Sequence, residues 1–383
     1  MLSSRIKNLQ ESATLAISSK AKEMRKKGIQ VIDFSVGEPD FDTPENIKEA
    51  AKDALRNGFT KYTNASGIPE LKEAVSKKLK KENNLSCSPD EVIVSNGAKH
   101  AIFNALFALL DKNDEVIISV PYWTSYGEQV KLVGGTPIFA ETDNFDIDPS
   151  RIMEKTTKKT KLIIINSPNN PSGFVYNRES LKKIAKFAVE NNIFVLSDEV
   201  YEKLTYEDEH FSIGAINNEI KRLTITVNAL SKTYSMTGWR IGYAAAPYEL
   251  IKAMSDIQSQ TTSNPNSIAQ YAALEALNGN QDYVKKSREE FKKRRDYFVQ
   301  RIDTIKEINC QKPKGAFFVF PDFSSKEKNS IKLSTDLLEK AKIATVPGTA
   351  FGQEGHIRFS YATSRENIKE GLDRLENFVK NLK

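Results

Sequence analysis

Residues 161–198 read KLIIINSPNNPSGFVYNRESLKKIAKFAVENNIFVLSD, and they contain two apolar runs on either side of an amphipathic segment. Residues 161–166 and 193–198 each contain four consecutive apolar residues, which is typical of strands that are buried on both faces of a sheet. Residues 178–192, between the two runs, carry apolar side chains at helical spacing. The order strand, helix, strand predicts a β-α-β unit with parallel strands.

The same alternation continues on both sides of this unit. Further apolar runs that read as buried strands lie at 91–95, 115–120, 223–227 and 241–246. Helical segments such as residues 98–110 lie between them. We therefore predict that residues 48–285 form a large three-layer α/β/α domain around a mostly parallel sheet.

Residues 1–47 and 286–383 have a different pattern, and we expect them to form an N-terminal arm and a smaller α+β domain. Short strand-like segments in these regions are found at 315–323, 343–351 and 356–362. The last helix has one apolar face, formed by Ile368, Leu372, Leu375 and Val379. Ser364 is the predicted cap of that helix. Thr43 is predicted to cap an earlier helix that has Pro44 at its first position.

The composition is that of an ordinary globular protein, with 383 residues, 39% hydrophobic residues and a net charge of +6. Basic residues are interleaved with acidic ones and form no nucleic-acid-binding motif. Two cysteines, Cys87 and Cys310, suit a reducing compartment. No signal peptide or run of about 20 apolar residues is found, so we predict a cytoplasmic protein with no nucleic-acid or membrane partner.

Two classes of enzyme are disfavoured by the sequence. No G-x-G-x-x-G motif follows a strand, which argues against a nucleotide-dependent dehydrogenase. The chain has three histidines, His100, His210 and His356, which argues against metal-dependent hydrolysis. We predict no metal site.

Ligands of open α/β sheets bind at the carboxyl ends of the strands, so the residues after each run are candidates for a site. Gly97 forms a turn after residues 91–95, and Ala98 and Lys99 begin the next helix. Backbone N–H groups at such a position attract phosphate, although an ordinary strand–helix turn has the same pattern. Trp123, which follows residues 115–120, is consistent either with stacking on a flat ligand or with core packing.

Polar residues follow three of the remaining runs. Asn170 either presents an amide or belongs to a turn, and Asp198 is either a buried acid with a partner or the cap of a turn. Lys232 has small, hydroxylic or apolar neighbours, and Arg240 follows eight residues later. An amine, an acid, an arginine and a phosphate-binding turn are the groups that pyridoxal 5′-phosphate requires.

Nine motifs together carry a resemblance over essentially the whole chain: VGEPDFDTP, KYTNASGIPELKEAV, NGAKHAIFNAL, PYWTSY, NSPNNPSG, SDEVY, SKTYSMTGWRIGY, VPGTAFG and IRFSYA. In this order, they resemble the class I aminotransferases of fold type I, and the chain is most similar to the bacterial and archaeal aspartate aminotransferases of subgroup Ib. The resemblance implies the fold of the pyridoxal-phosphate-dependent transferases of fold type I. It also implies transamination between an amino acid and a 2-oxo acid.

The resemblance assigns roles around the cofactor ring. Lys232 is implied to form the Schiff base and to move the proton between the substrate Cα and the cofactor C4′. Asp198 is implied to pair with the pyridine nitrogen, and Tyr201 and Asn170 to bind the phenolic oxygen. Trp123 is implied to stack on the ring. Trp123 and Asn170 are also expected to contact the substrate.

The resemblance likewise assigns the phosphate and carboxylate sites. Arg240, Gly97, Ala98 and Ser231 are implied to hold the phosphate. Arg358 is implied to bind the substrate α-carboxylate through two parallel hydrogen bonds, and Gly37 to let the backbone approach that carboxylate. Ala229 departs from the family, because many members have serine or glycine at that position. We expect this alanine to change the affinity of the protein for the cofactor.

Lys99 lies at a helix start, where a cation is unfavourable unless an anion is nearby. That anion is either the cofactor phosphate or a second carboxylate of the substrate. In the branch that the chain resembles, the matching lysine recognises acidic side chains, which implies aspartate as donor and 2-oxoglutarate as acceptor. The resemblance also implies a homodimer with shared active sites, in which Tyr62 reaches the phosphate of the neighbouring subunit.

Other activities remain open at this point. Relatives act on prephenate, aromatic amino acids or kynurenine with much the same residues. Pyridoxal-phosphate-dependent lyases share the fold, the lysine and the acid. A non-catalytic, effector-binding role is a further alternative, which the lack of a DNA-binding extension disfavours.

Overall fold

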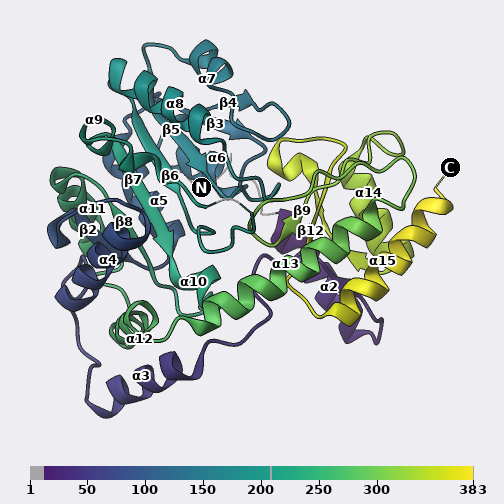
Figure 1. Ribbon diagram of the computed structural model, residues 1–383, viewed down its shortest axis with the longest axis horizontal. Coiled ribbons are helices and arrows are strands. Elements are labelled where there is room, and N and C mark those ends of the chain that lie inside the picture. Colours follow the sequence, from purple (N-terminus) through teal and green to yellow (C-terminus); the bar gives the residue numbers. More distant parts are fainter. Residues whose placement is uncertain (1–12, 208, 383) are drawn as a thin grey trace, which may run out of the picture.

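The computed structural model describes residues 13–207 and 209–382, so the first twelve residues of the predicted N-terminal arm lie outside the described part. A seven-stranded sheet with the order β2-β8-β7-β6-β5-β3-β4 is its centre (Figure 1). β8 is antiparallel to both of its neighbours, and the other strands are parallel to one another. The strands are β2 (Val92–Ser95), β3 (Glu115–Val120), β4 (Thr136–Glu141), β5 (Thr160–Asn166), β6 (Phe194–Asp198), β7 (Thr224–Ala229) and β8 (Gly242–Ala245).

Helices cover both faces of this sheet (Figure 1). Successive strand residues point to opposite faces, so Val116 and Ile118 pack in one core cluster and Ile117 packs in another. The helices of this part are α3 (Glu45–Arg56), α4 (Pro69–Glu82), α5 (Ala98–Leu109), α6 (Ser125–Leu132), α7 (Pro149–Lys155), α8 (Arg178–Glu190), α9 (Asn218–Lys221), α10 (Leu230–Thr233), α11 (Tyr248–Thr261) and α12 (Ser267–Asn278). Short helical turns lie at Pro89–Glu91 and Ile213–Ala215. The predicted three-layer α/β/α architecture is confirmed.

Two small sheets lie beside the large one. β1 (Ile32–Asp33) pairs in parallel with β10 (Ile343–Ala344), and β12 (Ile357–Ser360) lies between β11 (Val346–Pro347) and β9 (Phe318–Val319) in antiparallel orientation. The helices around them are α2 (Ala13–Lys26), α13 (Asp282–Ile302), α14 (Ser330–Asp336), the turns Leu337–Ala341 and Gly348–Phe351, and α15 (Arg365–Lys380). Their common core is rich in phenylalanine and contains the four apolar residues predicted on the last helix.

Several local predictions have a clear outcome. All six predicted strands of the large sheet are present, and the Ser364 hydroxyl accepts a hydrogen bond from the Asn367 N–H at 3.2 Å, as expected for a cap. The prediction for Thr43 is wrong. Pro44 is the N-cap of α3, and the Thr43 hydroxyl instead donates to the Ser235 carbonyl at 2.7 Å and accepts from the Trp239 indole at 3.0 Å.

The division into two domains stays a prediction. Its boundaries at residues 47/48 and 285/286 fall inside α3 and α13. α13 runs from beside the large sheet to the small ones (Figure 1), so one continuous helix connects the two regions. Within the described residues, none of the helices is long and apolar enough to cross a membrane.

Candidate active site

A cavity of about 370 Å³ lies where the carboxyl ends of several parallel strands meet. Eleven of the thirteen residues predicted for the site line it: Gly37, Ala98, Lys99, Trp123, Asn170, Asp198, Tyr201, Ser231, Lys232, Arg240 and Arg358. These residues come from separate segments of the chain. The topology of the sheet brings them together, because parallel strands present their carboxyl ends at one edge.

Asp198 ends β6 and is 4% exposed. Its carboxylate accepts hydrogen bonds from the Tyr126 hydroxyl at 2.6 Å and from the Val200 N–H at 3.2 Å. Burial raises the pKa of Asp198 to about 6, although these two hydrogen bonds act in the opposite direction. Both interpretations of Asp198 therefore hold, since it is a buried acid with a donor and also bonds the turn that follows.

Lys232 lies in α10, directly after β7, and its amine donates to the Gly37 carbonyl at 2.6 Å. Burial lowers the pKa of Lys232 to about 8, the charge of Glu38 opposes this change, and the charges of Arg358 and Arg240 add to it. The amine is therefore much closer to its neutral, nucleophilic form at physiological pH than a solvated lysine is.

The loop after β5 joins two sides of the cavity. The Asn170 side-chain oxygen accepts from the Arg358 guanidinium at 3.0 Å, and its backbone N–H donates to Asn166 at 2.9 Å. Asn166 in turn donates to the backbone oxygen of Asp198 at 3.1 Å. Tyr201 is 5% exposed, and burial raises the pKa of its hydroxyl. Asn170 is thus an amide that faces the site as well as a loop residue.

Gly97 precedes α5 with a φ of +84°, a left-handed conformation that glycine adopts without strain. A Cβ at Gly97 would lie 2.5 Å from a guanidinium nitrogen of Arg240, and a Cβ at Gly242 would lie 2.3 Å from the Ala98 nitrogen. The two glycines therefore let Arg240 and the start of α5 come close together. The first N–H groups of this helix have no intrahelical acceptor, which suits an anion beside Arg240.

Lys99 and Trp123 lie against each other on another wall of the cavity. The Lys99 amine is 4.8 Å from the centre of the Trp123 ring, in the range of a cation–π contact. Burial and the charge of Arg240 lower the pKa of Lys99. Tyr126, from the same motif as Trp123, is 1% exposed, so the aromatic segment both lines the cavity and fills the core.

Two of the thirteen predicted residues do not line the cavity. Gly97 lies directly behind Arg240. Tyr62 is 89% exposed. It belongs to none of the cavity walls formed by the described part of this chain.

Sequence reasoning missed several residues of the site. Tyr126 and Asn166 were not among the predicted site residues. Both have positions at strand ends that could have suggested a role, but their hydrogen bonds to Asp198 depend on neighbouring strands. The other lining residues that were not predicted are Thr124, Ser125, Val200, Ala229 and Thr237.

Comparison with known proteins agrees with this geometry. The family profile "Aminotransferase class I and II" matches residues 29–375. The chain is 48% identical to an aspartate aminotransferase of Bacillus sp. (strain YM-2), with 99% of each chain covered. It is 46% identical to the aspartate/prephenate aminotransferase of Thermus thermophilus, with 97% of each chain covered. A solved structure of the Thermus thermophilus aspartate aminotransferase with maleate superposes with a TM-score of 0.95, at 45% identity and 99% coverage of both chains.

The chain belongs to the class I and II aminotransferases. This aminotransferase therefore depends on pyridoxal 5′-phosphate and transfers an amino group between an amino acid and a 2-oxo acid. The resemblance found in the sequence and the predicted fold type are confirmed.

The charges in the cavity of this aminotransferase fit that cofactor. Arg358 is 2% exposed, and its Nε lacks a hydrogen-bond partner among the described residues. Within the described chain, no carboxylate lies within ion-pair distance of Arg358, Lys232 or Arg240. A buried cation without a carboxylate partner, such as Arg358, is costly, so this site is built for anionic ligands. A phosphate and a carboxylate meet that requirement, and Asp198 offers an acid to a ring nitrogen.

Proposed function

We propose that this aminotransferase transfers the amino group of aspartate to 2-oxoglutarate. The observation that carries the proposal is the presence of two cations, Arg358 and Lys99, in one cavity. Neither has a carboxylate partner in the described part of the chain. Aspartate and 2-oxoglutarate are both dicarboxylates, so each offers one carboxylate to each cation.

Arg358 suits the α-carboxylate, which all amino acids share. Its Nη1 is bonded to Asn170 at 3.0 Å and its Nη2 to the Ser35 carbonyl at 2.7 Å, so the guanidinium is fixed in one orientation. A fixed, planar guanidinium binds a carboxylate through two parallel hydrogen bonds. Burial lowers the pKa of Arg358 to about 10, which still leaves it charged at neutral pH.

Lys99 suits the second carboxylate, which distinguishes aspartate from an uncharged donor. The names of the relatives support this choice, since they include aspartate and aspartate/prephenate aminotransferases. Maleate, named in the Thermus thermophilus structure, is itself a dicarboxylate. Prephenate also carries two carboxylates, so a role in prephenate transamination is the second candidate.

The remaining residues are proposed to act on the cofactor. Pyridoxal phosphate, when bound, supplies a ring that accepts the electrons of the substrate Cα–H bond. Asp198 would hold the proton on the ring nitrogen, and Tyr201 and Asn170 would donate to the phenolic oxygen. Trp123 would cover the face of the ring.

The phosphate would be held by one group of residues at the start of α5. Arg240, Ser231 and the backbone of Gly97, Ala98 and Lys99 form this group, and Ala229 beside it removes one hydroxyl donor that relatives have. Gly37 would leave room for the substrate carboxylate beside Arg358. A Cβ at Gly37 would have the Phe318 ring as its nearest contact, at 3.7 Å.

Lys232 is proposed to hold the cofactor aldehyde and then to move the proton. Its neutral amine accepts the proton from the substrate Cα and delivers it to the cofactor C4′. The low pKa of Lys232, about 8, supports this role because the amine must be deprotonated to accept a proton. Both atoms must lie within reach of one flexible side chain, and Lys232 is a lining residue of the cavity.

The active sites are proposed to be shared in a homodimer. Tyr62 is exposed in a single chain, as are Phe59 and Leu55 nearby. A tyrosine hydroxyl on an exposed segment is available to a phosphate of a second subunit. A cytoplasmic location is part of the same proposal and rests on the composition of the sequence.

A panel of amino donors with 2-oxoglutarate as acceptor tests the proposed substrate. We expect aspartate to have the highest kcat/KM, and alanine and phenylalanine to have values lower by at least about 10-fold, the effect of one charge-assisted hydrogen bond. If prephenate with a dicarboxylic donor reacts faster than 2-oxoglutarate with aspartate, the second candidate is the better assignment. Equal rates for charged and uncharged donors would refute the proposal.

A further inference from the structure

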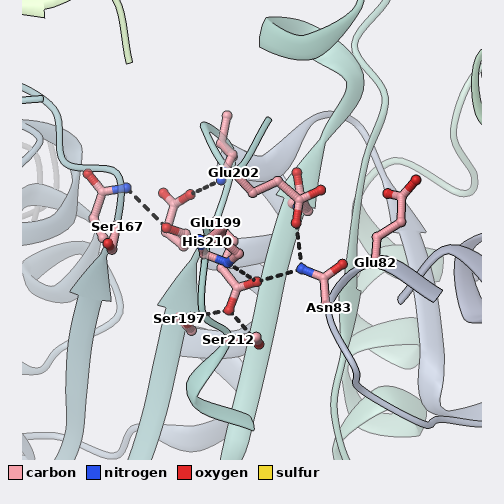
Figure 2. A network of polar contacts seen from close by, with 12 residues as sticks. Glu82, Asn83, Ser167, Ser197, Glu199, Glu202, His210 and Ser212 are labelled. Carbon is pink, nitrogen blue, oxygen red and sulfur yellow. Dashed lines mark hydrogen bonds and ion pairs between the residues drawn. The ribbon is translucent and has the colours of Figure 1, made fainter. Parts of the chain in front are cut away.

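A second polar cluster surrounds Glu199, the residue that follows Asp198 in the chain (Figure 2). Glu199 follows Asp198 in the chain, and its side chain is 1% exposed. The carboxylate accepts hydrogen bonds from four groups: Ser197 Oγ at 2.9 Å, Ser212 Oγ at 2.7 Å, Asn83 Nδ2 at 3.1 Å and His210 Nε2 at 2.9 Å. Glu199 is therefore held from several segments of the chain.

Glu202 anchors the other end of the same turn. Its backbone N–H donates to the Glu199 carbonyl at 2.9 Å, and its carboxylate contacts Lys78 and Asn83 at the end of α4. Tyr201, which faces the cavity, lies between the two glutamates. The turn thus presents Asp198 and Tyr201 to the cavity while Glu199 and Glu202 fix it from behind.

The charges of this cluster balance when His210 is protonated. Its carboxylates are Glu82, Glu199 and Glu202, and its lysines are Lys78 and Lys203. Lys203 lies 2.9 Å from Glu82, and Lys78 contacts both Glu82 and Glu202. Three carboxylates face two lysines, so a protonated His210, whose Nε2 lies 2.9 Å from Glu199, would supply the third positive charge.

The surroundings of His210 favour its charged form. Burial lowers the pKa of its imidazole, but the charge and hydrogen bond of Glu199 and the charge of Glu202 raise it, against a smaller opposing effect of Lys78. The net direction is upward. Burial also acts to raise the pKa of Glu202, but Lys78 and His210 lower it to about 2.

The cluster is not assigned as a metal site. Glu199, Glu202 and His210 lie close enough together to ligate an ion. Their oxygen atoms, however, already accept hydrogen bonds from Lys78, Asn83 and two serines. A metal ion would have to replace a lysine that is already present as the cation.

We propose that Glu199 and His210 are positioning residues for Asp198: Glu199 fixes the turn that presents Asp198 to the cofactor, and protonated His210 neutralises the charge that Glu199 places behind Asp198. This inference rests on the proposed role of Asp198 at the ring nitrogen. Asp198 performs that role only as a carboxylate, and the negative charge of Glu199 by itself favours the protonated acid. The positive charge of His210 offsets this effect of Glu199 on the protonation of Asp198, and His210 needs no contact with the cofactor to do so.

A pair of variants separates charge balance from simple packing. His210→Asn leaves Glu199 without its cation, so kcat for aspartate should fall by about 10-fold while KM changes by less than about 2-fold. The midpoint of the pH-dependent absorbance of the bound cofactor should rise by about 0.5, because an extra negative charge nearby favours protonated forms. Adding Glu199→Gln to His210→Asn removes that charge but keeps a side-chain oxygen that can accept from Ser197 and Ser212. Both kcat and the midpoint should therefore return toward the wild-type values.

The matched control is Glu207→Gln. Glu207 belongs to the same loop and forms a two-fold ion pair with Arg295, which is outside the cluster. We expect it to lower the melting temperature while kcat and the absorbance midpoint stay unchanged. The rate of cofactor release from the holoenzyme, measured by dilution into a trapping protein, should rise in His210→Asn and not in Glu207→Gln.

A direct measurement does not depend on any variant. The chain has three histidines, so the ring nitrogens of His210 can be followed by NMR in the ¹⁵N-histidine-labelled holoenzyme. We expect His210 to be protonated at pH 7.

Two results would overturn the inference: a neutral His210 at pH 7, or losses in the double variant that equal or exceed those of His210→Asn. The proposed role of Asp198 is tested separately, because Asp198→Ala should abolish turnover whether or not His210 matters. If Asp198→Ala remains active, the role of Asp198 at the ring nitrogen is refuted. If Asp198→Ala is inactive but His210→Asn behaves like the wild type, only the positioning role of Glu199 and His210 is refuted.

Discussion

The Lys232 amine donates a 2.6 Å hydrogen bond to the carbonyl oxygen of Gly37, which lies 195 positions earlier in the chain. Lys232 follows a strand of the seven-stranded sheet, whereas Gly37 follows β1 of the two-stranded sheet. The contact places the amine at the junction of the two regions, where burial lowers its pKa. The reactivity of Lys232 is therefore a property of both regions together.

The first prediction concerns the pH dependence of cofactor uptake. The neutral amine attacks the aldehyde, and the folded-state pKa of Lys232 is about 8 instead of 10.5. The uptake rate of the cofactor-free protein should therefore rise with pH, with a midpoint near 8, and level off above it. Stopped-flow absorbance measures this rate.

The identity of the reacting lysine is checked on the same protein. Borohydride treatment of the holoenzyme followed by peptide mapping should place the cofactor on Lys232, and Lys232→Ala should take up no covalent label and should not turn over. A midpoint near 10.5, or label on another lysine, contradicts the assignment.

The second prediction concerns substrate choice. Lys99→Met keeps a long unbranched side chain beside Trp123 and removes the charge. We expect kcat/KM for aspartate to fall by about 10- to 100-fold, the value of a charge-assisted hydrogen bond of about 1.5–3 kcal/mol. Steady-state kinetics with alanine as donor provide the comparison, and alanine should be affected far less. An equal loss for both donors would mean that Lys99 serves the cofactor phosphate.

The third prediction concerns the shared site. Tyr62→Phe and Lys232→Ala should each impair the enzyme, and mixing the two proteins should form hybrid dimers. If Tyr62 acts on the partner's cofactor, one site of the hybrid carries both changes and the other site carries neither. Activity should then recover in part when the subunits exchange, as monitored by differently tagged chains. Proven exchange without recovery would show that Tyr62 acts within its own subunit or not at all.

The fourth prediction concerns the phosphate-binding turn. Gly97→Ala places a Cβ 2.5 Å from a guanidinium nitrogen of Arg240 and forces alanine into a φ of +84°. Cofactor affinity, measured by equilibrium titration, should fall by about 10-fold or more, since a displaced Arg240 would lose a charge-assisted hydrogen bond of about 1.5–3 kcal/mol to the phosphate. Gly238→Ala is the control, because a Cβ at Gly238 would have no atom within 4 Å among the described residues. Equal affinity in both variants would mean that Arg240 is not held through Gly97.

Much of the architecture and of the candidate site could be predicted from local patterns in the sequence. Apolar runs identified six strands of the large sheet, because a strand buried on both faces is apolar at most of its positions. β4 was not identified, because it is an edge strand with mixed exposure and therefore lacks that signature. The motifs also marked Lys232, Asp198 and Arg358, whose residue types at strand ends are unusual.

Long-range contacts could not be predicted in the same way. The Tyr126 hydroxyl reaches Asp198 across 72 positions, and Asn83 reaches Glu199 across 116. Thr43 had the sequence of a helix cap, yet its hydroxyl bonds residues about 190 positions away.

The physical reason is that local patterns and long-range contacts depend on interactions between residues at different separations along the chain. Periodicity and capping depend on neighbours within a few residues, so the chain alone specifies its strands, its helices and the residue types at their ends. Hydrogen-bond partners and the pKa values of buried groups depend on which elements pack together. The partner of Thr43, the low pKa of Lys232 and the charge balance behind Asp198 were therefore decided only when the sheet and its helices were assembled.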